Sequence, residues 1–254
     1  MTGVPEEVAG GAISRDAAYW AESVTRFAPG TGPNVSGRRP TGPLQGFGRL
    51  WQKSYRAYVG PGVTPEQAIA EWRSHFGTFW PRGNRFAGAL TPIAPGDVAP
   101  IAVDTHAGFR VATGVLVIYA DERSFTFMTP EGHMFAGWIT FSATEVRALP
   151  GIDDGGTELD ITVLIRPNDP LYELGWPVMK RAEDAFWSAT LRNLAAHLGA
   201  GRVEVTTTAV VVDRQRLWRN WRNVRHNAGV ASLAHAVARP VRAGAALARR
   251  RRRG

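Results

Sequence analysis

The chain has 254 residues and no cysteine, and 44% of its residues are hydrophobic while 20% are charged. This length supports one domain with a full hydrophobic core, and the composition excludes a disordered chain. The lack of cysteine excludes disulfides, thiolate metal sites and thiol nucleophiles, and a cytoplasmic location is expected. The first residues lack the pattern of a secretory signal, and no apolar run approaches the roughly 20 residues of a membrane span.

The net charge of +8 is unevenly distributed along the chain. Residues 202–254 carry a charge of +11, and the residues before them carry −3. This imbalance predicts a nearly neutral body followed by a polybasic tail. We therefore expect three segments: an N-terminal helix and Gly/Pro-rich arm over 1–48, one domain over 49–212, and a basic Trp/Arg-rich helical tail over 213–254.

The first half of the chain is predicted to contain two helices and one strand. A short helix is expected over 15–27. Residues 50–59 are rich in aromatic and β-branched side chains, which favours a strand. The tetrapeptide Thr-Pro-Glu-Gln at 64–67 has the residue order of a capped helix start, and aromatic residues follow at helical spacing. Pro81 ends this second helix, and residues 83–100 are expected to be irregular.

The second half of the chain is predicted to form a meander followed by a long helix. Four strands separated by short turns are expected, which favours antiparallel pairing, over residues 109–119, 124–128, 134–143 and 158–165. Asp169 and Pro170 begin a helix that runs to about His197. A further strand, at a sheet edge, is expected over 203–212.

This order of elements predicts an α+β fold of the helix-grip kind, in which a curved antiparallel sheet wraps on a long C-terminal helix, with a basic helical tail beyond it. A sheet and a helix arranged in this way do not close completely. We therefore expect a cavity of roughly a few hundred Å³ between the meander and the helix, suited to a small hydrophobic or lipid-like ligand.

Several segments of the chain resemble an uncharacterised bacterial family that belongs with the SRPBCC (START-like) superfamily. They include Trp-Gln-Lys-Ser-Tyr-Arg at 51–56, Phe-Trp-Pro-Arg-Gly-Asn-Arg-Phe at 79–86 and Asn-Asp-Pro-Leu-Tyr-Glu at 168–173, together with most of 116–141. The resemblance spans roughly residues 45–200. It implies a helix-grip fold with a ligand cavity, and it implies no reaction.

The candidate ligand-binding residues are aromatic or polar side chains of the predicted strands and of the long helix. They are Tyr55, Phe125, Phe127, Trp138, Phe141, Thr162 and Phe186. Arg56 and Asp160 are further candidates for polar groups that reach into the cavity. For each aromatic residue, ordinary core packing is the alternative interpretation.

The candidate acid–base residues are Glu131, His133 and Asp160. Glu131 and His133 lie two positions apart on a predicted hairpin and could share a proton in general acid–base catalysis. The alternative is that Glu131 points to water while His133 bonds to the backbone. The histidine spacings match no metal-binding motif, and no cofactor motif is present, so neither a metal nor a cofactor is predicted.

The basic tail contains a segment in which tryptophan and arginine alternate. The arginines expected to bind an anionic surface are Arg214, Arg216, Arg219, Arg222, Arg225, Arg249, Arg250, Arg251, Arg252 and Arg253. Trp218 and Trp221 are three positions apart, as in a basic amphipathic helix that lies at a membrane surface. The same side chains could bind nucleic-acid phosphates, or the tryptophans could pack on the body.

Three functions remain open at this point. The first is binding of a small hydrophobic ligand, with peripheral attachment to the inner face of an anionic membrane through the tail. The second is an enzyme that acts on a ligand in the same cavity. The third is an adaptor for nucleic acid or protein that uses the tail. The sequence does not predict an oligomeric state.

Overall fold

The protein is described by a computed structural model that covers residues 19–21, 24–88, 92–105, 109–147 and 155–238. In chain order the elements are β1 (Pro40–Thr41), η1 (Pro43–Gln45), β2 (Leu50–Gly60), α2 (Pro65–His75), η2 (Phe76–Phe79), β3 (Arg85–Phe86), β4 (Val98–Asp104), β5 (Arg110–Ala120), β6 (Ser124–Pro130), β7 (Phe135–Val146), β8 (Gly156–Pro167), α3 (Pro170–His197), β9 (Thr206–Asp213) and η3 (Trp218–His226). The symbol η marks a 3-10 helix.

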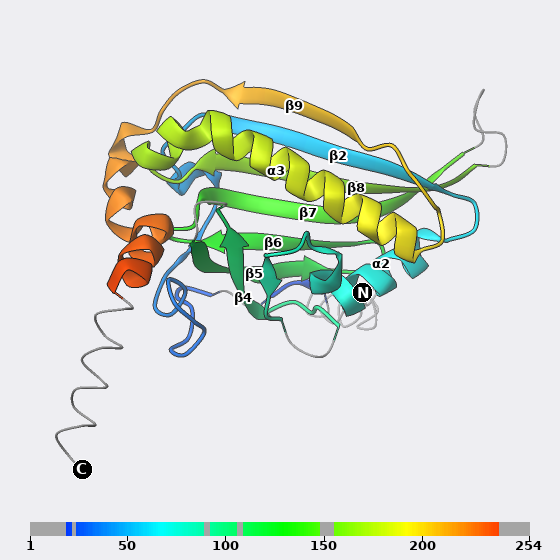
Figure 1. Cartoon of the computed structure of the whole chain (residues 1–254), viewed down its shortest axis with the longest axis horizontal. Helices are drawn as coiled ribbons and strands as arrows, with labels where there is room; N and C mark the ends of the chain where they lie inside the picture. Colours follow the sequence, from blue (N-terminus) through cyan, green and yellow to red (C-terminus); the bar gives the residue numbers. More distant parts are fainter. Residues whose placement is uncertain (1–18, 22–23, 89–91, 106–108, 148–154, 239–254) are drawn as a thin grey trace, which may run out of the picture.

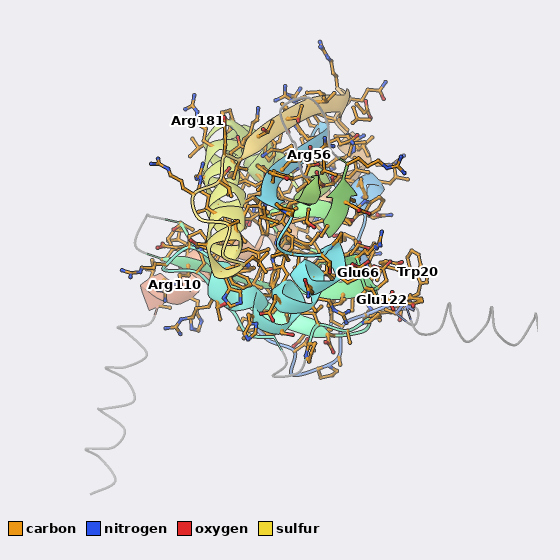
Figure 2. The ribbon with its side chains drawn as sticks, turned by 90° about the vertical axis from the view of Figure 1, so that its right-hand side faces the viewer. Trp20, Arg56, Glu66, Arg110, Glu122 and Arg181 are labelled. Atoms are coloured by element: carbon orange, nitrogen blue, oxygen red, sulfur yellow. The ribbon has the colours of Figure 1, made fainter. Side chains whose placement is uncertain are left out.

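One curved antiparallel sheet carries the fold, with the strand order β3-β4-β5-β6-β7-β8-β2-β9 and with β1 paired to β6. The long helix α3 crosses the concave face, and α2 covers one end of that face (Figure 1). In Figure 2 the yellow α3 lies on one side of the sheet, and Arg181 extends from it away from the strands. This arrangement confirms the predicted α+β helix-grip class.

Alternation of side chains along the strands determines which residues face α3. In β8 the four aliphatic residues Leu159, Ile161, Val163 and Ile165 are buried, and the residues between them lie on the convex face. The register continues this pattern across the sheet, because Ile161 pairs with Tyr55 on one side and with Phe141 on the other. A row of large side chains therefore crosses the concave face.

The N-terminal ends of the two main helices agree with the sequence prediction. Thr64 and Gln67 form the expected capping box at the start of α2. The side chain of Asp169 accepts hydrogen bonds from the backbone N–H groups of Leu171 and Tyr172 at the start of α3. Both caps satisfy backbone donors that a helix start would otherwise leave unpaired.

Two parts of the described chain differ from the prediction. Residues 83–100, expected to be irregular, contain β3 and the first three residues of β4, and β4 pairs with β5 along its whole length. The α-helix that begins at Pro65 ends at His75 and continues as the tighter turn η2, so its aromatic stripe does not keep α-helical spacing. Most of the helix expected over 15–27 lies outside the described residues.

The tail also differs from the amphipathic α-helix expected around Trp218 and Trp221. Residues 218–226 form the 3-10 helix η3, and residues 228–238 then form a helix. Three asparagine side chains, those of Asn220, Asn223 and Asn227, hydrogen-bond to the body. In a 3-10 helix the side chains at positions i and i+3 lie directly in line. Trp218 and Trp221 therefore lie in one row along η3 and not on the broader face of an amphipathic α-helix.

Candidate functional site

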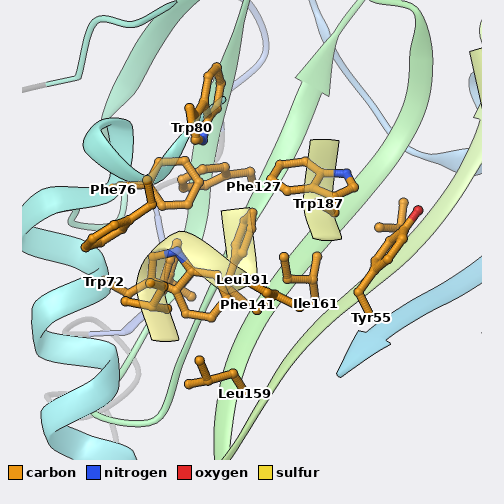
Figure 3. Packing of buried hydrophobic residues seen from close by; sticks show 14 of the residues in the cluster. Tyr55, Trp72, Phe76, Trp80, Phe127, Phe141, Leu159, Ile161, Trp187 and Leu191 are labelled. Carbon is orange, nitrogen blue, oxygen red and sulfur yellow. The ribbon is translucent and has the colours of Figure 1, made fainter. Parts of the chain in front are cut away.

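The space between the sheet and the helices is lined by aromatic side chains. Phe125, Phe127 and Phe141 are buried on the concave face, and the ring of Phe76 from η2 lies within 5.6 Å of all three ring centroids. Trp187 of α3 contacts Phe141 from above (Figure 3). These side chains fill this end of the interior, as the core-packing interpretation expects.

The structure places five of the seven predicted ligand-binding residues in this interior. Besides the three phenylalanines of the sheet, Tyr55 lies on the concave face and Phe186 of α3 packs against the rings of Trp80 and Trp187.

The other two candidates, Trp138 and Thr162, lie on the convex face. Trp138 is an odd number of positions from buried Phe141, and strand alternation therefore places it on the opposite side of the sheet. Thr162 lies between two buried residues of β8 for the same reason. The expectation that these two side chains line the interior is corrected accordingly.

Asp160 and Arg56 also lie on the convex face, where they form an ion pair. Arg56 Nε donates to Asp160 Oδ2 at 2.9 Å, and Thr162 Oγ1 donates to Asp160 Oδ1 at 2.6 Å. These bonds hold the carboxylate away from the interior. The prediction that Arg56 and Asp160 reach into the cavity is therefore wrong.

A buried ionic cluster lies between β2 and α3. Lys53 Nζ is 2.6 Å from Glu183 Oε2 and 2.6 Å from Asp184 Oδ1. The Lys53 side chain is completely inaccessible to solvent, and that of Glu183 is 6% exposed. The hydroxyl of Tyr55, the next inward-facing residue of β2, donates to Asp184 Oδ1 at 2.8 Å. Four polar side chains thus meet where the helix crosses the sheet.

The cluster combines two carboxylates with one ammonium group. Burial raises the pKa of Glu183, and the adjacent Lys53 ammonium opposes that shift. Burial, reinforced by the charges of Glu183 and Asp184, raises the pKa of Tyr55, so its phenol stays a neutral hydrogen-bond donor.

Several polar atoms around the cluster have unused hydrogen-bonding capacity. The indole N–H groups of Trp51 and Trp176 are buried without a partner, and the two rings lie 5.3 Å apart. The Trp187 indole faces the carboxylate of Glu183, yet Oε1 of that carboxylate has no partner with hydrogen-bond geometry. The interior therefore offers donors and an acceptor beside aromatic surface, which suits a ligand with one polar end.

The hairpin between β6 and β7 holds the other two candidate acid–base residues. Glu131 accepts a hydrogen bond from Arg39 at 3.0 Å. His133 is buried, and its Nδ1 accepts a hydrogen bond from the backbone N–H of Phe135 at 3.0 Å. Burial lowers the pKa of His133 to about 4, so the imidazole is neutral at pH 7. His133 therefore bonds to the backbone, and neither residue meets Asp160.

Two open hollows on the described surface are lined by none of the predicted ligand-binding residues. One has a volume of about 760 Å³ and includes Asp104, Arg110 and His235 in its lining. The other has a volume of about 560 Å³ and is lined by residues such as Arg192 and Glu204. In the structure as described, the aromatic side chains occupy the interior that the fold would offer to a ligand.

The described part of the tail packs on the body while its arginines face solvent. Arg216 Nε is 3.0 Å from Glu173 Oε1 at the start of α3. Four further arginines of this segment are exposed and make no ion pair within the described residues: Arg214, Arg219, Arg222 and Arg225. Trp218 and Trp221 are 69% and 47% exposed. Arg249 to Arg253 lie outside the described residues.

Sequence reasoning missed Lys53, Glu183 and Asp184, although two signals were present. Lys53 has the same parity as Tyr55 in β2, so strand alternation already placed it on the buried face. Glu183 lies four residues after Met179 and three before Phe186, and helical spacing therefore places it on the same side of α3 as these two apolar residues. The contact between Lys53 and the two carboxylates depends on how α3 crosses β2, and no pattern within a single segment of the sequence predicts that crossing.

No protein-family model and no curated protein matches the chain. Among solved structures it is similar to that of Ara h 8.0201, at 11% identity, with a TM-score of 0.40, over 60% of this chain and 99% of that one. It is also similar to protein Ms6760 from Mycobacterium smegmatis, at 16% identity, with a TM-score of 0.40, over 59% and 91% of the two chains.

A third similar structure is the di-domain ARO/CYC StfQ from the steffimycin biosynthetic pathway. The identity is 11% and the TM-score 0.44, over 59% of this chain and 51% of that one. Likenesses of this strength carry no argument about ligand or reaction. The curved sheet and the long C-terminal helix themselves define the helix-grip fold, whereas no comparison supports the resemblance to one uncharacterised family.

Replacing Lys53 with Met should strongly destabilise the protein at neutral pH. The substitution preserves much of the aliphatic volume but leaves the buried Glu183 without its counter-charge and beside the partly exposed Asp184, at a cost of about 3 kcal/mol. Urea unfolding measures the change. The matched control is Lys180→Met, at a half-buried lysine over the Trp51 ring, which should cost less than about 1 kcal/mol. Equal losses would contradict the assigned role of Lys53.

The buried His133 should make the fold sensitive to acid. Its pKa is lowered from 6.5 to about 4, so the unfolded chain binds a proton there more tightly than the folded chain. Its contribution is therefore complete above pH 6.5 and is lost as the pH falls towards 4, by roughly 3 kcal/mol in all. Unfolding free energies of His133→Gln should fall less over this range than those of wild type or of His226→Gln. Parallel pH profiles for all three proteins would refute this.

Proposed function

We propose that the protein binds a small amphipathic ligand between the sheet and α3. The observation that carries the proposal is the buried cluster of Lys53, Glu183, Asp184 and Tyr55, surrounded by aromatic side chains and by polar atoms with unused hydrogen-bonding capacity. The polar end of the ligand would meet this cluster. Its hydrophobic part would lie among the aromatic residues of the concave face.

Entry of a ligand requires α3 to move, because aromatic side chains occupy the interior. Pro177 lies inside α3 and removes one helical hydrogen bond next to Trp176, which provides a natural point of bending. Leu174 and Val178, on the outer side of the same segment, are 81% and 72% exposed, so few contacts hold it from outside. These features support admission of the ligand by displacement of the first half of α3.

Native mass spectrometry of the gently purified full chain, followed by organic extraction, should reveal a small molecule bound in a one-to-one ratio. Adding the extracted molecule to delipidated protein should raise the melting temperature, since a ligand that binds only the folded state stabilises it. Tyr55→Phe, which removes only the hydroxyl beside Asp184, should weaken this binding about tenfold, whereas Lys180→Met should not. A clean apo mass together with no thermal shift from lipid extracts would overturn the proposal.

A second function, attachment to an anionic membrane surface, is favoured by the exposed face of η3. Trp218 and Trp221 are exposed there beside arginines that have no acidic partner in the described structure. Each arginine near anionic lipid contributes about 1 kcal/mol, and tryptophan favours the headgroup region. None of the described helices is long and apolar enough to cross a bilayer. We therefore propose peripheral contact through η3 and the residues beyond it.

Co-sedimentation with vesicles tests this second function. The full chain should pellet with vesicles that contain phosphatidylserine but not with neutral ones, and Trp218→Ser with Arg219→Glu should reduce pelleting several-fold because both contacts are lost. Arg181→Glu is the matched charge reversal on the outer face of α3 and should have little effect. Equal binding to both vesicle types, or RNA binding that the tail variants abolish, would contradict membrane attachment.

A further inference from the structure

Three side chains with metal-binding atoms meet where the C-terminal ends of α2 and α3 come together. Glu71 and His75 lie one turn apart on α2, and His197 is the last residue of α3. His197 Nε2 is 2.9 Å from Glu71 Oε2, and His75 Nδ1 is 3.2 Å from the same oxygen. Their three ligand atoms all lie within 4.8 Å of one another.

Two of the three separations between these atoms are close to those of a tetrahedral zinc site, and the third, between the two imidazole nitrogens, is at most 4.8 Å. Zn²⁺ binds imidazole nitrogen and carboxylate oxygen at about 2.0–2.1 Å, which puts neighbouring ligand atoms about 3.3 Å apart. The two nitrogen–oxygen distances of 2.9 and 3.2 Å need only a small opening to reach that value. Two imidazoles and one carboxylate are also a donor set that zinc and related transition metals prefer.

Packing and charge prepare the three groups for a cation. The His197 ring lies 5.2 Å from the ring of Phe79 and 5.6 Å from that of His75, so both imidazoles are held near the carboxylate. Glu71 supplies the carboxylate oxygen that both imidazoles face. The side chains are 43–50% exposed, and an ion can therefore reach them from solvent.

We propose that Glu71, His75 and His197 bind one divalent transition metal ion, with Zn²⁺ as the preferred ion and water completing its coordination. The metal would replace the hydrogen bond between His197 and Glu71 Oε2 and the close contact of His75 Nδ1 with the same oxygen. It would link α2 to the end of α3, the two helices that cover the concave face (Figure 1). The proposal rests on this cluster alone and does not depend on the ligand in the interior.

The test uses the full chain without a polyhistidine tag, after treatment with a chelator. Calorimetric titration with Zn²⁺ should give one binding site, and Co²⁺ should produce the visible absorption of a four- or five-coordinate ion. His75→Ala, His197→Ala and Glu71→Gln should each weaken binding at least about tenfold. Glu71→Gln is the most informative variant, because an amide keeps a hydrogen-bond acceptor for the histidines but is a poor zinc ligand.

His235→Gln is the matched control, since it removes a histidine outside the cluster. It should bind Zn²⁺ like wild type. Circular dichroism of each metal-free variant establishes that it is folded, and the Co²⁺ spectrum then reports on the site itself. The proposal is overturned if wild type shows no saturable one-to-one binding, or if Glu71→Gln and both alanine variants bind Zn²⁺ as tightly as His235→Gln.

Discussion

The ammonium group of Lys53 lies on the concave face of the sheet without access to water, and Glu183 and Asp184 of α3 supply its counter-charge. A buried charge is tolerated only when it is paired, so α3 cannot rotate or slide along the sheet without exposing one ion to an apolar environment. Apolar contacts between α3 and the sheet are less directional, and by themselves they would allow several positions of the helix. The ionic cluster therefore favours one position of α3, which the apolar contacts of Trp176, Trp187 and Leu191 with the core also support.

The interior has two chemically different ends as a consequence. Near η2, phenylalanine rings from β6, from β7 and from the 3-10 turn pack in edge-to-face contacts, and the indoles of Trp72 and Trp80 pack against them. Near the crossing of β2 and α3, charged and hydrogen-bonding groups replace them. An interior that is mainly aromatic at one end and charged at the other matches an amphipathic ligand, which has one hydrophobic part and one polar end.

Much of this architecture was predictable because its signals are local. The alternation Leu159, Ile161, Val163, Ile165 and the residue order at Asp169 each determine a structure within one segment. The same alternation rule, applied strictly, would have excluded Trp138 and Thr162 from the interior. By contrast, β4 carries few aromatic residues and contains Pro100, so its pairing with β5 stabilises a strand that its own sequence only weakly favours.

In η3 and the residue after it, one set of side chains attaches the tail to the body and a different set faces solvent. Asn220, Asn223 and Asn227 bond to the body through uncharged amide groups, mostly to backbone carbonyls, while the arginines between them stay on the surface. Because the two sets do not overlap, arginines can be gained or lost over evolution without moving η3. Related chains could therefore change the surface to which this face is attracted while they keep the same fold and the same interior.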